Sequence, residues 1–130
     1  MGRIIVPVKI ENASDPAKCF ACDGLVDTGA SFMVLSNAWR DRLGPLRRVA
    51  EVEVEVATQD TVSGDICGPV LIQMEGFRPV YTEVLFVEMR PSDGQYEPLI
   101  GYTVLELSQA AVDMIGRRLV HLKHVDMKKM

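Results

Sequence analysis

Hydrophobic and polar residues alternate along much of this chain, in short runs separated by turn-forming residues. The clearest run covers residues 49–56, where three valines alternate with three glutamates between Glu51 and Val56. Because successive side chains of a strand point to opposite faces, this pattern predicts a strand with one buried and one solvent-facing side. Comparable runs predict further strands over residues 3–11, 18–26, 66–74, 80–89 and 98–101.

Turn-forming and helix-bounding residues divide these predicted strands. Ser36 is placed to cap a short helix over residues 37–43, which Gly44 and Pro45 would end. A second short helix is predicted over residues 103–109, and a last hairpin around residues 116–118, with strands over 112–114 and 119–122. The polar stretch 58–64 is typical of a hairpin tip. The whole pattern predicts an all-β fold with one or two short helices, built as a single domain over residues 1–130.

Composition and charge narrow the possible classes of function. Hydrophobic residues make up 48% and charged residues 25% of the 130 residues, which is the balance of an ordinary globular domain. The net charge is -4 and no run of Lys or Arg dominates, so nucleic acid is not an expected partner. No apolar stretch has the roughly 20 residues that a membrane span requires, and the first residues lack a signal-peptide pattern. We therefore expect a cytoplasmic protein with no membrane partner.

The segment with the clearest chemical content is Leu25-Val26-Asp27-Thr28-Gly29-Ala30, in which an apolar strand leads directly to an acidic residue and a glycine. Taken alone, Asp-Thr-Gly is also a common β-turn. A second element, Leu99-Ile100-Gly101, follows about seventy residues downstream and precedes the second predicted helix, with the polar hairpin tip between the two. Together these features resemble the retropepsin-like aspartic protease family, over roughly Ile4 to Leu122.

This resemblance implies a closed, barrel-like domain with one lobe per chain, and it implies roles for particular residues. Asp27, Thr28 and Gly29 would form the catalytic turn, with Thr28 hydrogen-bonding across a dimer. Substrate would be contacted by residues beside the turn and in a flap that closes over it: Leu25, Ala30, Ile100, Thr58, Gln59, Asp60 and Thr61. The substrate would be a polypeptide, and neither a metal nor an organic cofactor would be needed.

The presence of one such motif indicates how the site would be completed. Hydrolysis by this route uses two carboxylates, one as general base on a water and the other as general acid. The chain has one Asp-Thr-Gly and no Asp-Ser-Gly. A second carboxylate would therefore come from a second copy, and twofold symmetry places a residue opposite its own copy. We expect an endopeptidase that works as a homodimer through Asp27 of both subunits.

Other readings of the sequence remain open. A catalytically weak or inactive chain with the same fold could act as a dimeric peptide-binding module, because a fold does not determine activity. Cys19 and Cys22 form a Cys-x-x-Cys, and His121 and His124 a His-x-x-His, which together have the ligand count of a zinc site. Residues three apart on a strand point to opposite faces, so we interpret the cysteines as partly buried fillers.

Overall fold

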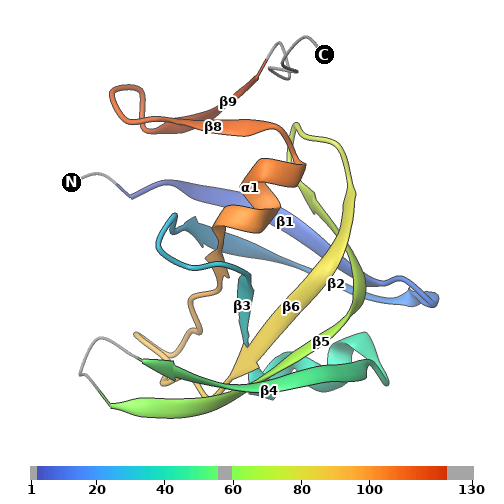
Figure 1. Ribbon diagram of the computed structural model, residues 1–130. Coiled ribbons are helices and arrows are strands. Elements are labelled where there is room, and N and C mark those ends of the chain that lie inside the picture. Colours follow the sequence, from blue (N-terminus) through green and yellow to red (C-terminus); the bar gives the residue numbers. More distant parts are fainter. Residues whose placement is uncertain (1–2, 56–59, 123–130) are drawn as a thin grey trace, which may run out of the picture.

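The computed structural model describes residues 3–55 and 60–122 (Figure 1). It has nine strands and two short helices within these residues. The strands are β1 (Ile5–Asn12), β2 (Asp15–Val26), β3 (Met33–Ser36), β4 (Arg47–Glu55), β5 (Thr61–Met74), β6 (Val80–Val87), β7 (Leu99–Ile100), β8 (Ala110–Asp113) and β9 (Arg118–His121). The helices are η1 (Asn37–Leu43), a 3₁₀-helix, and α1 (Tyr102–Leu107). The predicted all-β fold with short helices is confirmed.

Seven strands form one sheet, in the order β1-β2-β7-β3-β6-β5-β4, and β8 and β9 form a separate hairpin. The larger sheet curls back on itself because β1 pairs with β2 on one side and with β5 on the other. The expected closed barrel nevertheless needs a correction. Strand β7 has two residues and meets β3 through one pairing, Val34 with Leu99, and β4 lies outside the ring. The sheet is therefore strongly curled but not a strictly closed barrel.

The main core lies inside this curled sheet. On β1 the alternation of exposed and buried residues sends Val6, Val8 and Ile10 inward, as the period-two pattern predicts. They join fully buried residues from β3, β5 and β6, such as Leu35 and Ile72. Burying this apolar surface is the main force that holds the sheet in its curled form.

Strands β4 and β5 form a hairpin, which we call the flap hairpin after the flap that the resemblance predicts. Its strands start and end at other residues than the sequence predicts. Strand β5 begins at Thr61, and Gly64 pairs with Val52 of β4, so residues 61–64 belong to the strand and not to the predicted tip. Gly64 has a packing role here, because a Cβ at this position would lie 2.8 Å from Leu85 Cδ1. A glycine required by close packing has the same sequence signature as a turn glycine. The predicted tip residues Thr58 and Gln59 lie outside the described residues.

The two helices follow the predicted signals closely. The backbone N–H of Ala38 donates to Ser36 Oγ at 3.2 Å, and Gly44 ends η1 with a φ of 65°. Helix α1 ends at Leu107, two residues earlier than predicted, because Gln109 adopts a φ of 58° and turns the chain into β8. Neither helix among the described residues is long and apolar enough to span a membrane.

An ion pair ties η1 to the long strand β5. The Arg40 guanidinium donates from Nη1 to Asp65 Oδ2 at 2.7 Å, and its Cζ lies 5.4 Å from the centre of the Phe86 ring. A longer contact of 3.7 Å joins Arg48 to the same carboxylate. The hydrogen bond from Arg40 holds the pKa of Asp65 below its ordinary value of 3.8, since it favours the charged form.

We predict that Asp65→Asn lowers the free energy of unfolding by about 1 kcal/mol at neutral pH. Because the folded pKa of Asp65 is lowered, the pair stabilises the protein above pH 3.8, and this contribution is lost as the pH falls through the folded value. Urea unfolding at about pH 7, 5 and 2 would show the difference between wild type and variant shrinking at the lowest pH. Glu53→Gln, at an exposed position on β4, is the control. If the difference in unfolding free energy persisted at low pH, the loss would come from altered packing and not from the ion pair.

Candidate functional site

The Asp27 turn lies at the end of β2, where this strand runs parallel to β7. Val26 pairs with Ile100, and the backbone N–H of Asp27 donates to the Ile100 carbonyl at 3.0 Å. Two residues before Asp27, the backbone N–H of Leu25 donates to the Pro98 carbonyl at 2.8 Å. The two sequence motifs are therefore joined by backbone hydrogen bonds, which fix where the chain leaves the sheet and where Asp27 begins the turn.

Short hydrogen bonds within the turn orient the Asp27 carboxylate. Gly29 N–H donates to Asp27 Oδ1 at 2.9 Å, and Ala30 N–H donates to the Asp27 carbonyl at 3.1 Å. Asp27 and Ala30 are half-buried, whereas Thr28 and Gly29 are exposed. The Asp27 carboxylate is therefore fixed in orientation at the end of β2. Gly29 has no side chain, so the backbone next to this carboxylate is open to an approaching molecule.

Gly101 allows α1 to begin directly against this turn. Tyr102 N–H donates to the Ala30 carbonyl at 2.7 Å, and Thr103 N–H donates to the Ser31 carbonyl at 3.1 Å. A Cβ on Gly101 would lie 2.1 Å from the Phe32 carbonyl oxygen and 2.8 Å from that of Ala30. Since no side chain fits in this space, glycine is required here for the helix and the turn to approach so closely.

The residues predicted to contact substrate differ in how far they are buried. Leu25 and Ala30 are half-buried beside Asp27. Ile100 is fully buried and lies so close to Gly24 that a Cβ there would be 2.6 Å from Ile100 Cγ1, so its side chain supports the turn from inside the core and does not line an open surface. Asp60 and Thr61 are exposed at the start of β5.

A second apolar cluster, which sequence reasoning missed, connects the flap hairpin to the Asp27 turn. We call it the flap cluster: it consists of buried Val34, Ile66, Leu85 and Val87, with partly buried Ala30, Phe32, Val52, Val54, Met89 and Leu99 packed against them. The alternating valines of β4 were the signal for it, but the sequence does not indicate which strands they face. This cluster provides an apolar wall between the flap hairpin and the carboxylate.

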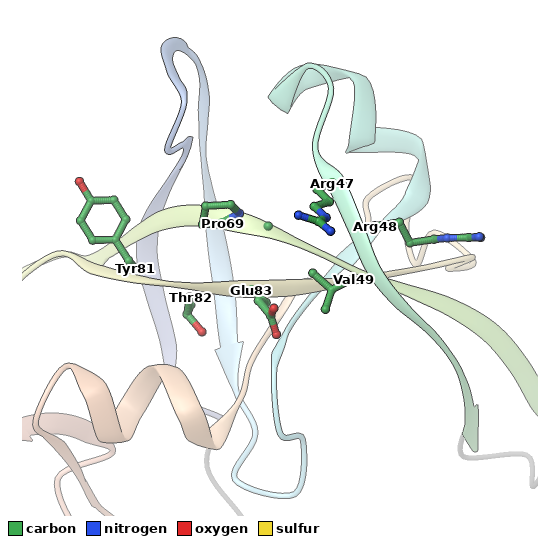
Figure 2. Close-up of a pocket in the computed structure, with 8 residues that line it drawn as sticks. Arg47, Arg48, Val49, Pro69, Tyr81, Thr82 and Glu83 are labelled. Carbon is green, nitrogen blue, oxygen red and sulfur yellow. The ribbon is translucent and has the colours of Figure 1, made fainter.

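Two cavities lined by described residues do not include the Asp27 turn. The larger one, about 440 Å³, lies on β4, β5 and β6, with Arg47, Pro69 and Tyr81 in its walls (Figure 2). The other, about 380 Å³, lies beside Trp39 and Tyr96. The Asp27 turn therefore lies outside both of these cavities.

The cysteine and histidine motifs are not gathered into a metal site in the described part of the chain, where no three potential metal ligands lie together. Cys22 is half-buried, in agreement with its interpretation as a partly buried filler, but that interpretation is wrong for Cys19, which is exposed on the opposite face of β2. All three cysteines are free. His121 stacks on Phe77 with ring centres 4.3 Å apart, and its Nε2 lies 2.7 Å from the Gly76 carbonyl. His124 lies outside the described residues.

Comparison with solved structures relates the whole arrangement to a known fold. The chain is similar to EIAV protease complexed with the inhibitor HBY-793, with a TM-score of 0.58 and 24% sequence identity. The alignment covers 81% of this chain and 86% of that one. Neither protein-family models nor curated protein sequences give a match. The likeness establishes a retropepsin-like fold for the chain.

We predict that Gly101→Ala lowers the free energy of unfolding by roughly 3 kcal/mol, because the new methyl group meets backbone oxygens that cannot move without separating α1 from the turn. Gly76→Ala is the matched control. Nothing lies within 4 Å of a Cβ at Gly76, but its φ of 86° disfavours alanine, by about 1–2 kcal/mol. Denaturant unfolding of both variants separates the two effects, and equal losses would refute the steric explanation.

The cysteines should also differ in their rates of alkylation. Burial raises the pKa of the Cys22 thiol to about 12, and Cys67 is fully buried, whereas Cys19 is exposed. Because the thiolate is the reactive form, we expect iodoacetamide at about pH 8 to modify Cys19 first. Peptide mass spectrometry of briefly treated native protein would measure this. Modification of Cys22 at the rate of Cys19 would contradict the structure.

Proposed function

We propose that this chain is one subunit of a homodimeric aspartic endopeptidase in which Asp27 of both copies activates a water molecule. The observation that carries the proposal is the turn at the end of β2, where Asp27 is tied to Ile100 through its backbone and to Gly29 through its carboxylate. The retropepsin-like fold supports it, and the similar solved structure is that of a protease.

The chemistry follows from placing two carboxylates close together. Like charges at short range cannot both ionise easily, so the pair holds one proton between them. The ionised carboxylate takes a proton from water as the oxygen attacks the peptide carbonyl carbon, and the protonated one donates to the carbonyl oxygen. The carboxyl group that took the proton from water then gives it to the leaving nitrogen as the C–N bond breaks, and a hydroxyl of the tetrahedral gem-diol returns a proton to the other carboxylate, which leaves the acid product and restores the pair. The apparent pKa values that govern this cycle belong to the pair.

The other residues of the turn and flap would bind and position the peptide. Thr28 and Gly29 would hold the two turns rigid and let the substrate backbone come close. Leu25 and Ala30 would contact substrate side chains, together with the flap residues Thr58, Gln59, Asp60 and Thr61. We expect the substrate to carry apolar side chains next to the cleaved bond. Val52 and Val54 of the flap cluster are only partly buried, so they would offer apolar contacts along β4.

The decisive test compares wild type with Asp27→Asn on a mixed peptide library between about pH 4 and 7, at concentrations where both proteins are dimeric. We expect the variant to lose turnover by about a thousandfold or more, and a statine peptide to inhibit the wild type. Asp23→Asn is the matched control, since Asp23 is exposed on the same strand, before the turn. It should leave turnover unchanged.

Two outcomes would count against the proposal. Equal turnover by wild type and Asp27→Asn would exclude Asp27 as the catalytic carboxylate. Binding of peptides by a well-folded wild-type dimer without any cleavage would favour the alternative function, a retropepsin-fold module that binds peptides or proteins.

A further inference from the structure

The larger cavity lies where two neighbouring strand pairings lose their register. The pairing of β4 with β5 shifts at Val49, and the pairing of β5 with β6 shifts at Gly68 and Pro69. Such bulges bend a strand and are often found next to functional surfaces. Gly68 has no side chain and Pro69 has a short ring, so a hollow of about 440 Å³ opens between the three strands.

Apolar groups surround this hollow and remain exposed. Tyr81 is 69% exposed and Val49 is 53% exposed, and both line its walls together with exposed Pro69. In Figure 2, Pro69 lies between Tyr81 and Arg47. Exposed apolar residues are common singly, but three around one hollow form a surface that a ligand would bury.

Arg47 gives the hollow a positive charge that no direct contact offsets in the described part of the chain. Its side chain has no hydrogen-bond or ion-pair partner among residues 3–55 and 60–122. The next residue differs, because Arg48 Nη1 lies 3.6 Å from Glu51 Oε2 and 3.7 Å from Asp65 Oδ1. A free guanidinium can donate two parallel hydrogen bonds to one carboxylate. A carboxylate is therefore the ligand group that Arg47 would recognise.

Glu83 limits how many carboxylates a ligand can carry into this hollow. Its half-buried side chain lines the same walls, and a Cβ on Gly68 would lie 3.2 Å from Glu83 Cγ, so the glutamate lies over the glycine. Glu83 also has no hydrogen-bond or ion-pair partner among the described residues. Because like charges close together repel each other, we expect a ligand with one acidic group, placed at the Arg47 end.

The strand register sets the distance that a ligand must span. Arg47 pairs with Gly68, and Tyr81 pairs with Leu71, three positions further along β5. Strands β4 and β6 lie on either side of β5, so Arg47 and Tyr81 are anchored about 10 Å apart across the strands and about 10 Å apart along them, or about 14 Å in all. An extended chain covers this length in about four residues, and residues four apart point to the same side.

We infer that the hollow is a docking site for an extended segment of a partner protein that carries one acidic residue four positions from an apolar or aromatic residue. Arg47 would bind the carboxylate, and Tyr81 would pack against the apolar side chain. Pro69, between them, would contact the middle of the segment. A small free anion would use Arg47 alone, whereas the exposed apolar groups favour a peptide. The inference does not depend on the proposed function, since no residue of the Asp27 turn lines this hollow.

The other cavity offers less to a ligand, because its aromatic and charged groups already contact one another. The rings of Trp39 and Tyr96 meet edge to face with centres 5.8 Å apart, and Arg42 Cζ lies 5.2 Å from the centre of the Trp39 ring. A ligand would have to displace these contacts, which costs binding free energy. No comparable contact of Arg47 or Tyr81 is found within the described residues.

The test measures peptide binding to the Asp27→Asn protein, so that the proposed activity cannot consume the probe. The probe is the peptide Gly-Gly-Glu-Ala-Pro-Ala-Phe-Gly-Gly with a neutral fluorophore, and fluorescence anisotropy gives its Kd. We expect a Kd on the order of 0.1 mM. Adding Arg47→Gln should weaken binding at least about tenfold, and adding Tyr81→Ala about fivefold. Arg90→Gln removes the same charge at an exposed position outside the hollow and should leave the Kd unchanged.

Two further measurements locate the bound peptide and identify the group that Arg47 recognises. A probe with glutamine in place of glutamate should bind at least about tenfold more weakly, and a statine peptide, which would occupy the Asp27 site, should not displace the probe. Equal binding of the two probes, an unchanged Kd for Arg47→Gln, displacement by the statine peptide, or no binding at about 1 mM would each overturn the inference. Circular dichroism should show Arg47→Gln and Arg90→Gln folded, since both positions are exposed.

Discussion

The parallel pairing of β2 with β7 is the contact on which the candidate site depends. It extends over two residues of each strand, yet it places the Ile100 carbonyl where Asp27 N–H can bond to it, and Gly101 where α1 can start against the turn. Buried Ile100 anchors this short strand in the core, and the space beside Gly24 accommodates its side chain. A small element can hold the turn because the surrounding core determines its position.

The same organisation separates what supports the site from what faces outward. The main core includes Ile100 and so holds β7, with which the end of β2 pairs. The flap cluster contains Ala30 of the turn as well as Val52 and Val54 of β4, so it joins the turn to the flap hairpin. Thr28 and Gly29 remain exposed at the turn itself.

Much of the fold could be predicted from local pattern, because alternation and capping are local properties. Strands β1 and β4 follow the alternation of apolar and polar residues closely, and η1 follows its capping residue Ser36. Pairings between distant segments, such as β1 with β5, leave no local signal, and Gly64 resembles a turn residue although packing against Leu85 requires it. That Ile100 lies near the Asp27 turn was predicted by resemblance, whereas its full burial is visible only in three dimensions.

The link between Asp27 and Ile100 also determines when the turn can form during synthesis. The partners are separated by more than half of the chain, so they make a contact of high sequence separation whose loop must close first. A chain emerging from the ribosome carries Asp27 long before the segment that positions it. The hydrogen bond from Gly29 to the Asp27 carboxylate is local and can form early, but the turn takes its place against β7 and α1 only after those segments have been synthesised.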